Sequence, residues 1–257
     1  MSVLDLLEKY PSATLPLGDF LAMLPPMRVR QYSIASSPLA DPTVASLGWS
    51  VLDAPHKSSE EKRHLGVASN YLSALEAHDH VHVTVKPSHG AFHLPSDIEN
   101  TPIIMACAGA GISPFRGFVE ERAMQKAAGR RLAPAYLFVG CQDPAKDRLF
   151  AEDFDKWEQE GVVKMFYAYS QATEKSEGCR YVQDRLWNEK EIIGEEFKNG
   201  AKFYVCGSAR VGEGVNRVAK EMYKEAALAK GLSKTDEEVE TWFRSIRGER
   251  FASDLFD

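Results

Sequence analysis

Residues 102–119 read P-I-I-M-A-C-A-G-A-G-I-S-P-F-R-G-F-V, and this stretch decides the fold of the chain. The short apolar run Ile103–Cys107 is typical of a buried parallel strand, because it is brief and begins with β-branched residues. The glycine pair in Gly109–Gly111 follows it, and Ser113–Pro114 stands where a helix can begin. The stretch therefore predicts a strand, a glycine turn and a helix N-terminus, in that order.

A strand, a glycine turn and a helix N-terminus together form a site for anions. Peptide N–H groups point outward there, and the helix dipole adds about half a positive charge. Such a site suits the pyrophosphate of a dinucleotide, although an ordinary strand-to-helix turn can share the pattern. Five other segments favour the same ligand: Arg30–Ser33, Gly66–Ser69, Tyr181–Gln183, Cys206–Ser208 and Asp254–Phe256.

Composition limits the classes of protein to consider. The 257 residues can hold one large domain or two small ones, and the net charge of -6 argues against nucleic acid as the main partner. No apolar run approaches the roughly 20 residues that span a bilayer, and charged residues interrupt any signal peptide at the N-terminus. The four cysteines lack C-x-x-C spacing, which argues against a metal site and favours a reducing compartment. We expect a cytoplasmic protein without a transmembrane segment.

The first hundred residues predict short helices and an antiparallel β-domain. Residues 1–27 contain two apolar helical stretches that end at prolines. Alternating patterns predict strands over Arg28–Ser36, Leu47–Leu52 and His80–Val85. The charged residues 53–64 predict a loop or a hairpin excursion, and Gly66–Leu75 a turn into a helix. We expect part of a small barrel up to residue 98.

From Pro102 onward, apolar strands alternate with helices. The expected strands are Ile103–Cys107, Ala135–Val139, Val162–Tyr169 and Lys202–Cys206. The expected helices are Pro114–Lys126, Phe150–Gln159, Tyr181–Asn188, Val211–Lys230 and Lys234–Ile246. This alternation predicts a doubly wound parallel sheet covered by helices on both faces. A change in composition at Pro95–Thr101 places the domain boundary between residues 98 and 99.

In combination, the motifs R-x-Y-S, G-V-A-S-N-Y-L, A-G-x-G-I-x-P-F-R-G-F, Y-V-Q and C-G resemble the FAD/NADPH module of the diflavin reductase family. That family includes NADPH–cytochrome P-450 reductase and the reductase part of self-sufficient fatty-acid monooxygenase fusions, which the chain resembles most. The resemblance runs over nearly the whole chain. It implies an α/β, ferredoxin-reductase-like fold, with FAD bound by residues 1–98 and NADPH by residues 99–257.

The resemblance assigns FAD to two motifs and a third segment. In the first motif, Arg30 would bind the pyrophosphate, Tyr32 would stack on the isoalloxazine and Ser33 would reach flavin N5. A surface arginine and a core tyrosine on an ordinary strand are the alternative for these residues. The remaining residues implied to hold FAD are Gln31 in the first motif, Gly66, Val67, Ala68 and Ser69 in the second, and Gly48 and Ser50 along the flavin.

For NADPH, the resemblance implies a pyrophosphate loop and a patch for the adenosine 2′-phosphate. Gly109, Ala110 and Gly111 match the loop, with Ala110 where a threonine is usual. The patch would consist of Ser170, Tyr181 and Gln183. The family usually has arginine after the serine, whereas this chain has Gln171, so Lys175 or Arg180 would have to supply the positive charge. Without that charge, the preference for NADPH over NADH would weaken.

The resemblance also implies which residues surround hydride transfer. Ser33, Cys206 and Asp254 would orient the nicotinamide and stabilise charge as hydride leaves it. Alone, Cys206 is also typical of a small buried apolar residue, and Asp254 would usually be a solvated carboxylate. Phe256 occupies the position where the family has a tryptophan that shields the flavin. We expect the smaller ring to relax discrimination between the coenzymes.

The resulting hypothesis is an NADPH-dependent reductase module. Electrons would pass from FAD to an FMN-binding flavodoxin-like domain and then to a heme monooxygenase domain. Neither domain is encoded in these residues, and the family's FAD domain has strands upstream of Leu4, so we expect a fragment of a longer chain. Two alternatives are a single-flavin ferredoxin–NADP reductase and an NADP-binding piece that holds no FAD.

Overall fold

The computed structural model describes residues 2–56, 59–88 and 90–256, and it divides into two packing units. Residues 1–32 and 49–83 form the smaller unit, and residues 33–48 and 84–257 the larger one. Side chains of residues 59–61 lie outside the description.

The smaller unit contains short elements set by local signals. Its elements are α1 (Val3–Lys9), α2 (Leu17–Met23), β1 (Asp53–His56), β2 (Ser59–Leu65) and α3 (Val67–Ser73). Ser2 and Asp5 start α1 with a capping box, in which each side chain binds the other residue's backbone N–H. Strands β1 and β2 pair antiparallel, with Asp53 opposite Leu65. This pair is the antiparallel sheet of the described fold.

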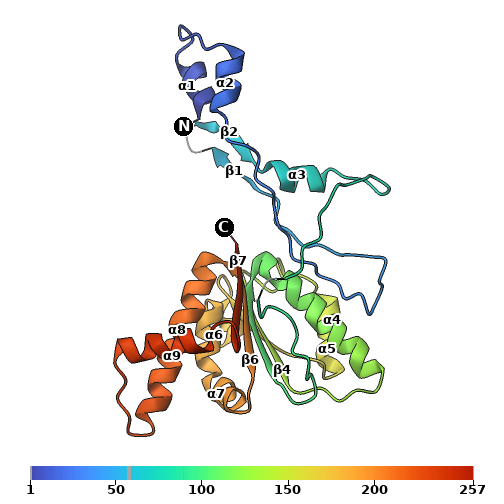
Figure 1. Ribbon diagram of the computed structural model, residues 1–257, viewed down its shortest axis with the longest axis vertical. Helices are drawn as coiled ribbons and strands as arrows, with labels where there is room; N and C mark the ends of the chain where they lie inside the picture. Colours follow the sequence, from blue (N-terminus) through green and yellow to red (C-terminus); the bar gives the residue numbers. More distant parts are fainter. Residues whose placement is uncertain (1, 57–58, 89, 257) are drawn as a thin grey trace. The chain divides into compact units, whose positions relative to one another are not determined.

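The larger unit is built on a five-stranded parallel sheet (Figure 1). Its strands are β3 (Ile103–Ala108), β4 (Ala135–Cys141), β5 (Lys164–Tyr169), β6 (Lys202–Ser208) and β7 (Phe251–Phe256). They lie in the order β5-β4-β3-β6-β7, and every neighbouring pair is parallel. Within this sheet, the chain first forms the central strand β3 and then adds β4 and β5 on one side. It then returns to the other side of β3, where it adds β6 and β7. The carboxyl ends of β3 and β6 mark the topological switch point.

Helices cover both faces of this sheet, as Figure 1 shows. They are α4 (Ser113–Ala127) and α5 (Ala151–Gln159) on one face, and α6 (Val182–Asn188), α7 (Lys190–Lys198), α8 (Ala209–Leu228) and α9 (Asp236–Ile246) on the other. Each face has its own buried core. Phe115 of α4 and Phe154 of α5 belong to one, and Leu186 of α6 and Val215 of α8 to the other. Burial on both sides explains why the inner strands β3 and β4 are almost wholly apolar.

The ferredoxin-reductase-like α/β class is confirmed, as are the four strands and five helices expected after residue 102. Helix α7 and strand β7 were not predicted. The hairpin within residues 53–64 and the helix after Gly66 are also present. The assignment of FAD to residues 1–98 and of NADPH to residues 99–257 remains a prediction.

The strands expected over Arg28–Ser36, Leu47–Leu52 and His80–Val85 are wrong. The first two contribute a single antiparallel bridge between Ile34 and Leu47, and the third has no regular structure. A strand requires a hydrogen-bonded neighbour, and an alternating pattern only indicates which side chains would share a face. Within the described ranges, no helix is long and apolar enough to cross a membrane.

Candidate active site

The glycine loop lies at the switch point of the parallel sheet. Strand β3 leads into a 3₁₀ turn, Gly109–Ile112, and then directly into α4. Gly109 has a φ of 56°, which favours glycine, and the space where a side chain would begin is open. At Gly111, an added Cβ would lie 2.3 Å from the carbonyl oxygen of Cys206. The two glycines thus serve different needs, an unusual backbone angle and the close approach of the loop to β6.

Three residues expected around hydride transfer come together in the larger unit. Cys206 on β6 and Asp254 on β7 are register partners in neighbouring parallel strands. The hydroxyl of Ser33 donates a hydrogen bond to Asp254 Oδ2 at 2.9 Å. Ser33 and Asp254 are 221 positions apart in the sequence, so the fold, and not local spacing, creates this contact.

The thiol of Cys206 is held in its neutral form. Its side chain is buried, and burial raises its pKa far above that of an ordinary thiol, with the negative charge of Asp254 adding to the effect. Cys107, its register partner on β3, is also buried and has a raised pKa for the same main reason. Neither is a thiolate nucleophile at neutral pH. The site offers a compact neutral S–H beside an exposed carboxylate.

The patch expected for the adenosine phosphate begins at the carboxyl ends of β4 and β5. The amide of Ser170 donates to Cys141 O at 3.0 Å, and the amide of Gln171 to Gln142 O at 2.8 Å. The side-chain amide of Gln171 also donates to Gln142 Oε1 at 3.2 Å. Gln171 is therefore engaged with the neighbouring loop, although it is exposed.

The two candidate cations differ in their surroundings. The guanidinium carbon of Arg180 lies 5.3 Å from the ring centroid of Tyr181. Lys175 lies in the 3₁₀ turn Thr173–Ser176. The pKa of Asp143 is lowered, chiefly by a hydrogen bond from the Ala145 amide and further by Lys146 and Lys175. Arg180 is thus the cation beside the expected adenine-binding tyrosine.

Sequence reasoning missed the residue that shapes this turn. The carboxylate of Asp184 accepts the backbone N–H groups of Arg180 at 3.1 Å and Tyr181 at 2.8 Å. The signal was present, because Asp184 stands three residues after Tyr181, at the acidic position of a capping box. Gln183 faces a different neighbour and packs against Gly214 of α8, where an added Cβ would lie 3.2 Å from its side chain.

Most of the expected FAD residues lie in the smaller unit. Arg30, Gln31 and Tyr32 lie in no helix or strand. The ring of Tyr32 meets that of Trp49 edge-on, with ring centroids 6.4 Å apart. Ser50 is exposed. Gly48 belongs to the larger unit instead, where its carbonyl accepts the Ser113 hydroxyl at 3.3 Å.

The second motif expected to bind FAD forms a compact turn around Leu52. Gly66 is the N-cap of α3, and an added Cβ there would lie 2.7 Å from both Leu52 Cβ and Ser69 Oγ. The buried hydroxyl of Ser69 accepts the Leu52 amide at 3.0 Å, and Asn70 donates to Leu52 O, also at 3.0 Å. Ser69 therefore stabilises the turn itself. The first helical residues, Val67 and Ala68, take no part in its hydrogen bond with the Leu52 amide.

Phe256 lies at the end of β7, opposite Ser208 of β6, and its side chain is exposed. Leu255, one residue earlier, packs on α8, where an added Cβ at Gly212 would lie 2.5 Å from it. The strand thus fixes the backbone of Phe256 and leaves its ring accessible.

Two family models match the chain. One, described as an FAD binding domain, matches residues 1–71, and the other, described as an oxidoreductase NAD-binding domain, matches residues 105–217. A bifunctional cytochrome P450/NADPH–P450 reductase of Fusarium oxysporum is 53% identical over 257 residues, and its counterpart ascE of Acremonium egyptiacum is 51% identical over 257 residues. The self-sufficient cytochrome P450 monooxygenase CYP505E3 of Phanerodontia chrysosporium is 46% identical over 258 residues. Each match covers all of this chain and 24% of the relative, so the chain spans about a quarter of their length.

Proposed function

We propose, on the premise that this chain belongs to the diflavin reductase family as its FAD/NADPH module, that it transfers hydride from NADPH to FAD. The observation that carries the proposal is the meeting of Ser33, Cys206 and Asp254 beside the glycine loop at the switch point. Dinucleotides bind at this place in open α/β sheets. Residues 1–98 would hold FAD and residues 99–257 NADPH.

The glycine loop fits a dinucleotide pyrophosphate. Gly109 leaves open space where any other residue would place a side chain, and Gly111 allows the loop to lie directly on β6. The loop continues into α4, a helix of 15 residues whose dipole favours negative charge at its start. Gly109, Ala110 and Gly111 would bind the phosphates mainly through their backbone.

At the other end of the coenzyme, three side chains would orient the nicotinamide. Bound FAD would supply the acceptor for the hydride. Cys206 offers a small neutral side chain, because its thiol stays protonated. A thiolate there would place an unfavourable negative charge next to Asp254. The carboxylate of Asp254 is held by Ser33 and suits the positive charge that the nicotinamide ring gains as hydride leaves. The proposed roles are therefore positioning and electrostatic stabilisation.

For the adenosine 2′-phosphate, we assign the missing positive charge to Arg180. The guanidinium of Arg180 lies over the ring of Tyr181, whereas the charge of Lys175 helps to lower the pKa of Asp143, and Gln171 is engaged with Gln142. Ser170, Tyr181 and Gln183 would complete the patch. In Arg180→Gln, we expect the Kd for NADP to rise about tenfold while that for NAD is unchanged, since an arginine–phosphate contact is lost. Lys175→Gln is the matched control, and an equal effect there would contradict the assignment.

Arg30 and Tyr32 would bind the pyrophosphate and the ring of FAD, with Gln31 in the same motif. The turn of α3 gives FAD a second contact through Gly66, Val67 and Ala68, and Ser69 keeps that turn in shape. Gly48 and Ser50 would lie along the flavin, and the accessible ring of Phe256 would cover it. A Phe256→Ala variant with an unchanged preference between NADPH and NADH would contradict this last role.

The electron acceptor is proposed from the names of the relatives, which pair a cytochrome P450 with an NADPH–P450 reductase. We propose that FAD passes electrons to an FMN-binding flavodoxin-like domain and then to a heme monooxygenase domain of one parent protein in the cytoplasm. The chain accounts for about a quarter of the relatives' length, which leaves room for both domains.

The test is anaerobic mixing of the FAD-loaded chain with NADPH, followed by visible absorption. We expect the oxidised flavin band to bleach, and more slowly in Cys206→Ala. A chain that binds NADP but retains no flavin would be a coenzyme-binding piece only. Rapid reduction of a ferredoxin without any FMN domain would favour the single-flavin ferredoxin–NADP reductase.

A further inference from the structure

A loop of the larger unit, residues 33–48, is closed on itself and packed on helix α4. Ile34 and Leu47 form an antiparallel bridge, and the Ala35 amide donates to Ser46 O at 2.7 Å. The hydroxyl of Ser36 accepts the amide of Ser46 at 2.9 Å. Ser33, the partner of Asp254, opens this loop. The position of the loop therefore sets the position of Ser33.

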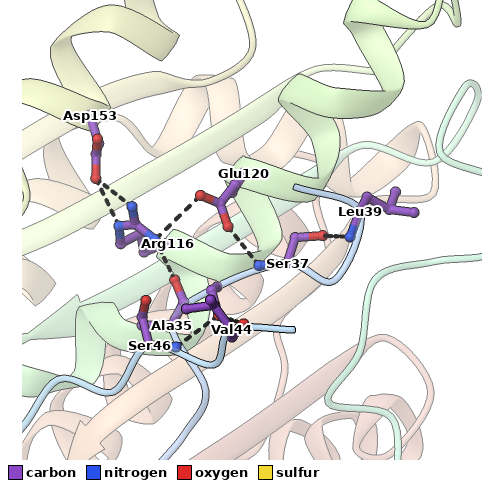
Figure 2. Close-up of polar contacts among 9 residues, drawn as sticks. Ala35, Ser37, Leu39, Val44, Ser46, Arg116, Glu120 and Asp153 are labelled. Atoms are coloured by element: carbon purple, nitrogen blue, oxygen red, sulfur yellow. Dashed lines mark hydrogen bonds and ion pairs between the residues drawn. The ribbon is translucent and has the colours of Figure 1, made fainter. Parts of the chain in front are cut away.

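Side chains of helix α4 bind the backbone of the loop (Figure 2). Arg116 Nη1 donates to Ala35 O at 2.8 Å, and Glu120 Oε2 accepts the Ser37 amide at 2.6 Å. Between them, Gly117 leaves room for the loop, since an added Cβ would lie 3.3 Å from Ile34 O. Ala35 and Ser37 are both buried by this contact. None of these contacts depends on the side chains of the loop.

Arg116 is itself fixed on several sides. Its Nε and Nη2 atoms each lie 2.8 Å from Asp153 Oδ2 on α5, and Nη1 lies 3.5 Å from Glu120 Oε1. The guanidinium carbon lies 5.2 Å from the ring centroid of Phe150 and 5.7 Å from that of Trp157. A planar guanidinium can serve all these partners at once, whereas a lysine ammonium cannot. Arg116 thus connects α4, α5 and the loop.

We propose that Arg116 is a positioning residue for hydride transfer, which acts on Ser33 and Asp254 through the carbonyl of Ala35. Ala35 is two residues from Ser33, and Ser33 holds Asp254 beside Cys206. This inference rests on the proposed function. To that function the inference adds Arg116, a residue that does not contact the side chains of Ser33, Cys206 and Asp254.

The test compares Arg116→Met, Ser33→Ala and the double variant of the full chain. We expect the carboxyl ¹³C resonance of Asp254 to move in the same direction in both single variants, and amide exchange at Ala35 and Ser37 to accelerate in Arg116→Met. In the FAD-loaded chain, each single variant should slow hydride transfer by about tenfold, since a small misplacement is costly. The double variant should be no slower than Ser33→Ala.

Arg130→Met is the matched control. Arg130 also pairs with a carboxylate, with Nε 3.3 Å from Glu99 Oε1, but contacts no residue of the loop. It should leave both the Asp254 resonance and the rate unchanged. If Arg116→Met does not fold, Gly117→Ala replaces it, because alanine favours the helix while its methyl group displaces the loop. It should move the Asp254 resonance without lowering Tm.

The inference is overturned if the variant at Arg116 or Gly117 leaves the Asp254 resonance in place, if Arg130→Met has an equal effect, or if the two single effects multiply in the double variant. The resonance and exchange measurements need no catalysis. A wild-type chain that does not reduce FAD would refute the proposed function, while these signals would still report on the contact between Arg116 and the loop.

Discussion

In the larger unit, apolar side chains from strands and helices pack into two cores, whereas in the smaller unit most large apolar side chains are exposed. Ile103, Phe138 and Tyr204 of the sheet are fully buried. Among the described residues of the smaller unit, only Ser69 is buried, and side chains such as Leu17 and Leu21 are exposed. Caps and turns can start helices and hairpins in both units. Burial of apolar side chains requires layers of secondary structure that face each other.

The largest contrast is expected from removing one apolar side chain in each unit. Phe138 on β4 is fully buried and stacks on Phe166 with centroids 4.8 Å apart. Phe138→Ala should lower the free energy of unfolding of the larger unit by about 3–5 kcal/mol, because it leaves a cavity. Leu21→Ala, at a side chain that is 57% exposed, should change stability by less than about 0.5 kcal/mol. Urea titration of both variants checks this, and equal effects would erase the contrast.

A second pair of variants tests the packing of the glycine loop. In Gly111→Ala, the new methyl group would meet the backbone of Cys206 at 2.3 Å, where no side chain can move aside. We expect the unfolding free energy to fall by about 1–3 kcal/mol and NADP binding to be lost. Gly194→Ala on α7 meets nothing within 4 Å and should stabilise the helix by about 0.5–1 kcal/mol. Calorimetry gives both values. A stable Gly111→Ala that still bound NADP would refute the close-approach argument.

The same contrast explains what the sequence could predict. The strands expected after Pro102 are each marked by an apolar run. The central strand β3 buries its side chains in both cores, so its apolar sequence agrees with its place in the sheet. Strand β7 was missed because Ser253 and Asp254 break that signal, and its pairing with β6 is set by tertiary contact. His80–Val85 alternates well but has no neighbouring strand among the described residues.

For the candidate site, motifs identified the residues, while their contacts needed coordinates. C-G and the terminal D-L-F gave no indication that Cys206 and Asp254 would be register partners, because pairing of distant strands is a property of the whole sheet. The hydrogen bond of Ser33 to Asp254 spans 221 positions and was equally inaccessible. Arg116 was overlooked because its partners come from α4, α5 and the loop 33–48, which only the fold brings together.

A smaller effect should appear when the pH rises. Burial raises the pKa of Tyr136 to about 12, and its hydrogen bond to Glu196 at 2.8 Å adds to the shift. The unfolded tyrosine ionises near pH 10, so its stabilising contribution is complete below about pH 10 and is lost as the pH rises to about 12. Because the ring is partly exposed, we expect about 1 kcal/mol. Tyr136→Phe should flatten this part of the stability profile. An unchanged profile would mean that other groups cause the loss of stability at alkaline pH.

The smallest effect is expected at the capping box of α1, and it should stay local. Ser2→Ala removes the acceptor of the Asp5 amide, which lies 3.1 Å from the Ser2 hydroxyl, and caps of this kind contribute about 1 kcal/mol to a helix. A seven-residue helix with no buried residue has little tertiary packing to compensate, so amide exchange within α1 should accelerate about fivefold. Amides of β3 should be unaffected, because local opening of α1 does not require opening of the parallel sheet. Hydrogen exchange by mass spectrometry separates the two segments. Faster exchange in β3 would mean that the two regions unfold as one, and the contrast in burial would then have no counterpart in stability.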